Sequence, residues 1–132
     1  MTNQRPPIKA QQSNIKNQKE SPVFTIDAAH PPRHPDEVED ELLHAWGRVR
    51  NSSSLRILKI IHGYGSGGKG GSTREVVRNW AFRNRGKFKQ VIDGEEYRLY
   101  NAATQELRQQ VGTFADADLD AGNSGITIVW VK

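Results

Sequence analysis

The stretch LRILKIIHGYGSGGKGGSTREVV, residues 55–77, joins a branched apolar run to a helical pattern through a glycine-rich loop. The run Leu55–Ile61 is nearly continuous in apolar side chains, which is typical of a strand that is covered on both faces of a sheet. Six of the nine residues from Gly63 to Gly71 are glycine. Ser72 and Glu75 then have the spacing of a capping box, which predicts that a helix starts here. This strand, loop and helix form the central α/β unit.

Further elements flank this unit on both sides. Segments 22–27, 87–93 and 126–131 have the composition of strands, whereas 36–50 and 100–112 have helical patterns. The apolar residues with helical spacing are expected in the core: Val38, Leu42, Trp46, Val49, Val76, Val77 and Trp80. We therefore predict an α/β fold with a small mixed sheet of about four strands. The first three strands are expected to be parallel and the last antiparallel, with covering helices in a two-layer sandwich.

The chain has 132 residues, enough for one domain with a modest core. Residues 1–20 hold few apolar side chains, so we expect a disordered basic tail, with the folded domain at residues 21–132. The absence of cysteine excludes disulfides and a cysteine nucleophile. No apolar run approaches the roughly 20 residues that cross a bilayer, and no signal peptide is recognisable. We expect a soluble cytoplasmic protein without a membrane partner.

The net charge of +4 is unevenly distributed along the chain. The first twenty residues hold four cations and one acid, so the rest of the chain is nearly neutral. Within that rest, one stretch gathers basic residues around a single acid: Lys69, Arg74, Arg78, Arg83, Arg85, Lys87 and Lys89. A basic face of this kind favours a phosphate-rich partner, although many charge clusters are only solvated surface.

Two nucleotide-binding motifs overlap in the glycine loop, and neither fits fully. Gly63, Gly65 and Gly68 have the spacing of a dinucleotide fingerprint, but they follow the second strand of a chain too short for that fold. Gly68 and Lys69 match part of a P-loop, but Gly70 replaces the hydroxyl residue that holds magnesium.

Both motifs bind phosphate through backbone amides of a glycine loop and of the helix that follows it. We retain this shared feature, a phosphate cradle, as the prediction for the loop. Glycines such as Gly63 and Gly65 allow backbone amides to approach a ligand closely, and the free N–H groups of the following helix favour an anion. Lys69 and Arg74 are placed to neutralise phosphate, and Arg78 follows them along the helix. We also expect the ring of Tyr64 to stack on a base, with a core position as the alternative.

The sequence resembles the Smr (small MutS-related) domain family from Ser21 to Lys132. The family has a strand ending in H-G-x-G before a helix, and His62–Gly65 supply this motif. A second family motif, L-D-x-H, ends an earlier strand. Here TIDAAH gives Asp27, then Ala29 at the histidine position, with His30 one place later.

The resemblance implies nucleic-acid binding and, in several members, endonuclease activity on RNA or DNA. Asp27 and His62 end two adjacent predicted strands, at the edge where such sheets bind ligands. We therefore take His62, Asp27 and His30 as candidate catalytic residues. A histidine can exchange a proton or contact phosphate near neutral pH. The alternatives are a His62 that is only hydrogen-bonded at a strand end and an Asp27 that only caps a turn.

RNA suits these residues better than DNA, because its 2′-hydroxyl can attack while imidazoles move protons. DNA hydrolysis would call for a divalent ion such as Mg²⁺ or Mn²⁺, for which Asp27 is the obvious ligand, so the sequence fixes no cofactor. Two other hypotheses stay open. One is a non-catalytic RNA- or ribosome-binding module, which Ala29 favours, and the other is a scaffold for a protein partner.

An acidic segment at 116–125 contains Asp116, Asp118 and Asp120 at alternate positions. A calcium loop of the EF-hand type would continue with glycine and end with glutamate, but Ala121 and Thr127 occupy those positions. We therefore expect a solvated acidic turn and no metal site.

Overall fold

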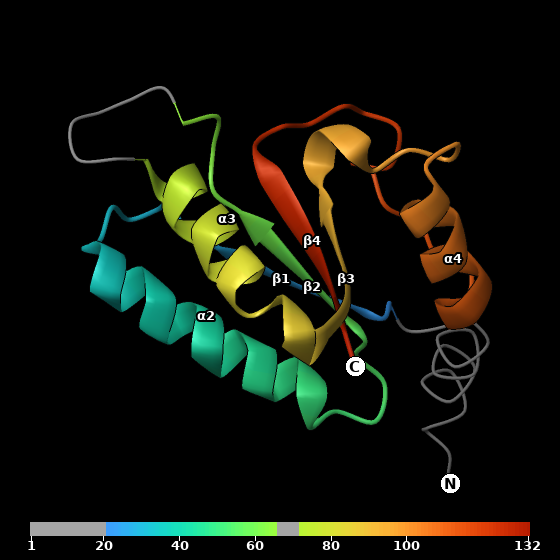
Figure 1. Ribbon diagram of the computed structural model, residues 1–132, viewed down its shortest axis with the longest axis horizontal. Helices are drawn as coiled ribbons and strands as arrows, with labels where there is room; N and C mark the ends of the chain where they lie inside the picture. The colour runs from blue at the N-terminus through green and yellow to red at the C-terminus, as the bar shows by residue number, and fades with distance from the viewer. Residues whose placement is uncertain (1–20, 66–71) are drawn as a thin grey trace, which may run out of the picture.

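The computed structural model describes residues 21–65 and 72–132, and the predicted basic tail lies outside these ranges. The elements are β1 (Val23–Asp27), α2 (Pro35–Arg50), β2 (Ile57–Ile61), α3 (Thr73–Arg83), η1 (Arg85–Lys87), β3 (Phe88–Asp93), η2 (Gly94–Glu96), α4 (Ala102–Val111) and β4 (Ile126–Val131). Their order follows the predicted order (Figure 1). No helix of the described segments is long and apolar enough to cross a membrane.

The four strands form one mixed sheet in the order β1-β2-β4-β3. β1 pairs with β2 in parallel, and β4 pairs antiparallel with both β2 and β3. β3 therefore runs in the same direction as β1 and β2, as predicted, but β4 separates it from them. The carboxyl ends of β1, β2 and β3 meet at one edge of the sheet, and the glycine loop leaves β2 at this edge.

Local signals in the sequence explain the two main helices. His34 accepts a hydrogen bond from Asp36 N and forms a capping box with Glu37, so α2 starts directly after the proline-rich turn. Ser72 and Glu75 form the predicted capping box at the start of α3. Each helix carries acidic residues in its first turn and basic residues in its last turn, which favours both helix dipoles.

The two faces of the sheet carry separate apolar cores. α2 and α3 lie side by side on one face, where Leu42, Val77 and Trp80 pack on Leu58 and Val129. On the other face the core is formed with α4 and the segment after it: Ile57, Ile92, Tyr97, Leu107, Ile126, Ile128 and Trp130. β2 and β4 are thus covered on both faces, as the apolar run Leu55–Ile61 predicted.

The expectation of a solvated acidic turn is wrong for Asp116. This side chain is buried, and Lys59 Nζ on β2 donates a 2.7 Å hydrogen bond to its Oδ1. Tyr97 donates its hydroxyl to the other carboxylate oxygen at 3.0 Å, and Asp118 also pairs with Lys59. Burial alone would lower the pKa of Lys59, but its bonds to the two aspartates outweigh burial and raise that pKa. The acidic segment therefore anchors the chain on the sheet.

Candidate active site and nucleic-acid interface

The candidate site lies at the edge where β1 and β2 end. Asp27 is the register partner of Ile61, and the backbone N–H of Ala28 donates to the carbonyl of Ile61 at 2.8 Å. The chain therefore leaves β1 directly beside the start of the His62–Gly65 motif. The structure confirms that Asp27 and His62 end adjacent parallel strands.

Asp27 and His30 form an exposed pair in the turn after β1. His30 Nδ1 lies 3.2 Å from Asp27 Oδ2, with the two side chains 77% and 43% exposed. Asp27 Oδ1 also accepts the backbone N–H groups of Ala29 and His30, at 2.9 and 3.1 Å. Asp27 therefore both caps the turn and orients the His30 ring. With Nδ1–H directed at the carboxylate, Nε2 of His30 is the ring atom available to a ligand.

These contacts keep Asp27 ionised. Burial would raise the pKa of this carboxyl, but the hydrogen bonds from Ala29 and from His30 outweigh burial and hold the pKa below its ordinary value. In the described chain no hydrogen bond connects Asp27 to His62. Of the two candidate catalytic histidines, the structure pairs Asp27 with His30.

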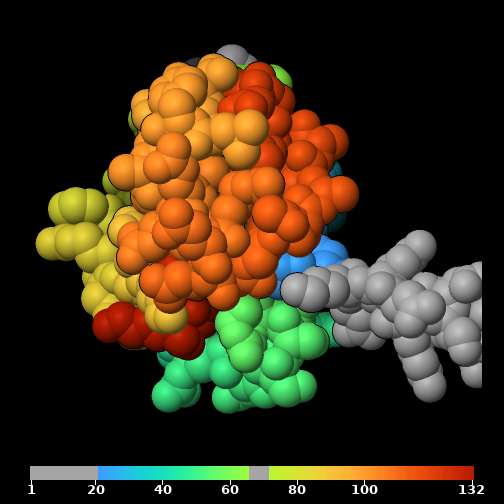
Figure 2. All heavy atoms as spheres, turned by 90° about the vertical axis from the view of Figure 1, so that its right-hand side faces the viewer, coloured from blue at the N-terminus to red at the C-terminus, as the bar shows by residue number. Residues whose placement is uncertain are grey.

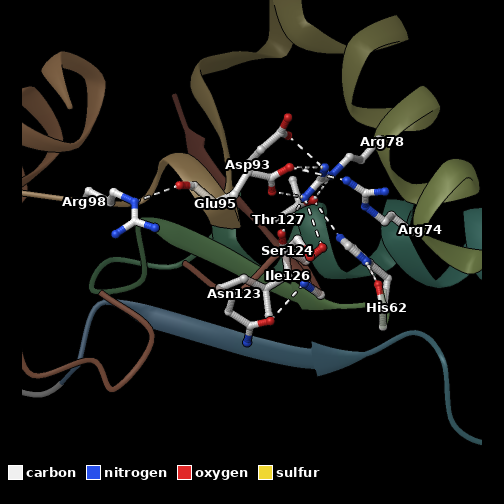
Figure 3. Close-up of polar contacts among 12 residues, drawn as sticks. His62, Arg74, Arg78, Asp93, Glu95, Arg98, Asn123, Ser124, Ile126 and Thr127 are labelled. Carbon is white, nitrogen blue, oxygen red and sulfur yellow. Dashed lines mark hydrogen bonds and ion pairs between the residues drawn. The ribbon is translucent and has the colours of Figure 1, made fainter. Parts of the chain in front are cut away.

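His62 is buried on the side of the sheet that α3 covers, with only 3% of its surface exposed. Its Nδ1 lies 2.8 Å from the carbonyl oxygen of Gly63, and its Nε2 lies 2.8 Å from the hydroxyl of Thr127 on β4 (Figure 3). Arg78 Nε donates to the same hydroxyl at 3.1 Å. Both ring nitrogens of His62 are therefore occupied by internal hydrogen bonds.

The donors and acceptors of this chain define the state of the His62 ring. Only a protonated Nδ1 can bond the Gly63 carbonyl, and Thr127, which accepts from Arg78, can donate its own proton to Nε2. Burial lowers the pKa of His62, and the positive charges of Arg78 and Arg74 lower it further, against the opposing effect of the bond to Gly63. His62 is thus a neutral imidazole that connects β2, β4 and α3.

Asp93 at the end of β3 and Glu95 in η2 pair with basic residues that the sequence analysis assigned to phosphate. Glu95 pairs with Arg78, with 2.8 Å between Oε1 and Nη2, and it also contacts Arg74 at 3.3 Å. Asp93 lies 3.4 Å from Arg78 Nε. The hydrogen bond from Arg78 lowers the pKa of Glu95 to about 2. Figure 3 shows Asp93 and Glu95 directed at Arg78 beside Thr127.

Two glycines in the described part of the glycine loop have positive φ. Gly63 and Gly65 have φ values of 82° and 80°, a region that side chains disfavour. A Cβ at Gly65 would lie 3.1 Å from Ser72 Oγ at the start of α3. Tyr64 between them is 68% exposed, so its ring is open to a partner and is not part of the core. Lys69 lies outside the described residues.

The structure thus brings together two groups at one edge, an exposed Asp27–His30 pair and a buried His62–Arg78 network. Sequence reasoning missed Thr127, Asp93 and Glu95 as members of the second group. Thr127 is the only hydroxyl residue in the apolar run 126–131, and the two acids follow the end of the third strand. Because the predicted parallel strands end at one edge, the position of these acids could have identified them as neighbours of the candidate site.

The candidate residues do not assemble a recognisable metal site. Asp27 is the only carboxylate of the predicted catalytic set, and its two oxygens contact Ala29 and His30. Within residues 21–65 and 72–132, no group of three or more His, Asp or Glu side chains is placed to hold a metal ion. Comparisons with models of protein families, with curated proteins and with solved structures find no match.

Proposed function

We propose that this protein binds RNA at the edge where β1 and β2 end and cleaves its phosphodiester bonds with the Asp27–His30 pair. The observation that carries the proposal is the exposed imidazole of His30, oriented by a carboxylate beside the His62–Gly65 loop. The resemblance to the Smr domain family supports the same class of activity. The open Tyr64 ring and the glycine amides would contact a base and a phosphate.

The chemistry follows from the orientation of His30. Its Nε2 takes the proton of a ribose 2′-hydroxyl, whose oxygen attacks the adjacent phosphorus. The bond from phosphorus to the 5′-oxygen breaks, and that oxygen receives a proton from solvent. The products are a 2′,3′-cyclic phosphate and a 5′-hydroxyl. The Asp27 carboxylate accepts a hydrogen bond from Nδ1–H of His30 and so stabilises the imidazolium that forms. His62 acts as a positioning residue, because its Nδ1–H bonds the Gly63 carbonyl.

The test is cleavage of a labelled single-stranded RNA compared with the same strand carrying 2′-deoxyribose. His30→Ala should lower the cleavage rate by about 10²–10⁴-fold while RNA binding changes little. His44→Ala is the matched control, because His44 is an exposed histidine on α2 whose Nδ1 bonds the Asp40 carbonyl, away from the Asp27–His30 pair. Equal cleavage of the deoxy strand, or an unchanged rate in His30→Ala, would contradict the mechanism.

A non-catalytic RNA- or ribosome-binding module is the second candidate. The observation that favours it is the burial of His62, whose ring nitrogens bond Gly63 and Thr127. In this case the wild-type protein binds RNA without cutting any substrate, whether or not Mg²⁺ or Mn²⁺ is added.

A further inference from the structure

The topology separates the charges of the molecule along the strand direction. α2 begins where β1 ends, and its acids lie in its first turns, close to the edge that also carries Asp27, Asp93 and Glu95. α2 then returns to the opposite edge, where β2 and β3 begin and β4 ends. Exposed basic residues gather at that opposite edge: Arg50, Arg56, Lys87, Lys89 and Lys132. We name these five residues the basic end.

Contacts show that the basic end is one continuous surface. Arg50 and Lys87 both lie over the half-buried ring of Trp46, 5.4 and 5.0 Å from its centroid. These three residues and Lys132 line one shallow hollow, and Lys132 Nζ donates to the Gly86 carbonyl at 2.9 Å. In Figure 2 the C-terminal residues (red), the start of β3 (yellow) and the segment after α2 (green) adjoin at the lower end.

A second hollow extends this surface along the edge. Arg50, Arg56 and Lys132 line it together with Val131 at the end of β4 and with Val49 and Leu55. Beyond Arg56, a further hollow contains Lys89, whose Nζ lies 5.0 Å from the centroid of Trp130. Among the described residues, none of the five cations of the basic end forms an ion pair with an acid, in contrast to Arg74 and Arg78. Their charges are therefore available to a ligand.

An exposed aromatic ring adjoins the basic end. Phe82 in the last turn of α3 is 63% exposed, and the guanidinium of Arg85 lies 4.0 Å from its ring centroid. Arg85 opens η1, which ends at Lys87. A flat ring beside unpaired cations is the combination that binds unpaired bases and their phosphates. An anionic membrane surface fits less well, because Phe82 is the only large apolar side chain exposed at this end of the described chain.

We propose that the basic end binds the backbone of single-stranded nucleic acid, with Phe82 stacking on a base. This site is separate from the Asp27–His30 pair, because the strands between them are five or six residues long, or about 20 Å at about 3.3 Å per residue. The proposal does not depend on cleavage at the other edge.

The experiment measures anisotropy of a labelled single-stranded RNA of about 12 nucleotides, a length typical for such sites, over a range of salt concentrations. Single variants Arg50→Gln, Arg56→Gln, Lys87→Gln and Lys89→Gln remove one charge each. Each phosphate contact that is lost should reduce the slope of log affinity against log salt by about 0.7. Arg98→Gln is the matched control, because it removes one charge beside Glu95 at the opposite edge.

Phe82→Ala tests the aromatic part of the surface. Affinity for RNA should fall by about 5- to 100-fold, the range for loss of one stacked base. Affinity for inorganic polyphosphate, which has no bases, should stay unchanged. A single-stranded DNA of the same sequence shows whether the site prefers RNA. Binding of RNA alone and binding of both strands each support the site.

The proposal is overturned if the four cation variants keep the slope and affinity of Arg98→Gln, or if the protein binds phosphatidylserine vesicles and not single strands. Thermal unfolding of each variant shows that the fold is intact. Failure of the proposed cleavage is distinguishable, because a protein that cuts nothing would still show the reduced salt slope in the four variants.

Discussion

The hydroxyl of Thr127 lies 2.8 Å from Nε2 of His62 and connects two residues that are 65 positions apart in the chain. Thr127 is the register partner of Ile60 on β2 and of Asp93 on β3. Its hydroxyl also accepts from Arg78 on α3. This one side chain on β4 therefore connects the H-G-x-G motif after β2 to α3.

Thr127→Val should destabilise the fold by about 1–3 kcal/mol, because it leaves His62 Nε2 buried without a partner. The measurement is the free energy of unfolding in urea. Thr25→Val on β1 is the control, since Thr25 is exposed and its loss leaves no buried group unsatisfied. Equal stability of the two variants would mean that the chain from Arg78 to His62 contributes nothing to the fold.

The stability of the protein should depend on pH through His62. Because folding lowers its pKa from 6.5, the unfolded chain binds a proton at a higher pH than the folded chain. The stability contributed by the neutral ring is complete above about pH 6.5 and is lost as the pH falls below that value. The free energy of unfolding should therefore decrease between about pH 7 and pH 5.

Replacing His62 by Gln should flatten this dependence, whereas His44→Gln should retain it. Glu95 does not affect the pH dependence in this range. Its pKa rises from about 2 to 4.5 on unfolding, so the stability that it contributes is lost only at a pH below that of the His62 effect. A His62→Gln protein with the full pH dependence would assign the effect to another group.

Glu95→Gln should strengthen RNA binding at the glycine-loop edge. The substitution removes the carboxylate that pairs with Arg74 and Arg78, so the Arg74 guanidinium becomes available to phosphate, whereas Arg78 keeps its contacts with Asp93 and Thr127. The expected result is a steeper dependence of affinity on salt, by about 0.7 for each cation released onto a single strand. Glu106→Gln on α4 controls for the change in net charge, because Glu106 contacts only Gln90. A slope equal to that of the control would remove Arg74 from the interface.

Gly94→Ala should destabilise the fold strongly. A Cβ at this position would overlap the carbonyl oxygen of Asn123 and lie 2.8 Å from that of Ile126, so the backbone before β4 would have to move. Overpacking of this kind costs about 1–3 kcal/mol or more, and the melting temperature should fall. Gly86→Ala is the matched control, because a Cβ there would meet no atom within 4 Å. Similar melting temperatures for the two variants would contradict the close approach at Gly94.

Local sequence signals were sufficient for the elements and their order. The end of β1 at Asp27 and the capping box of Ser72 and Glu75 were predicted at the residues where the structure has them. Apolar spacing identified Val38, Leu42 and Val49 as buried residues of α2, but Trp46 is only half-buried and Ala45 was missed. The unbroken run before the glycine loop identified the central strand. These features depend on hydrogen bonds and side-chain periods within a few residues, which a sequence displays directly.

The composition of the site depends instead on contacts between distant parts of the chain. In the sequence, Arg74 and Arg78 belong to one basic run with Lys87 and Lys89. In the fold, α3 places the first two beside Glu95, whereas the last two follow α3 and lie at the opposite edge. No local pattern reveals such a separation, because the strand order and register decide which charges meet. The insertion of β4 between β2 and β3 is also what places Thr127 beside His62, and that pairing, made only in the folded sheet, gives the buried Nε2 of His62 its hydrogen-bond partner.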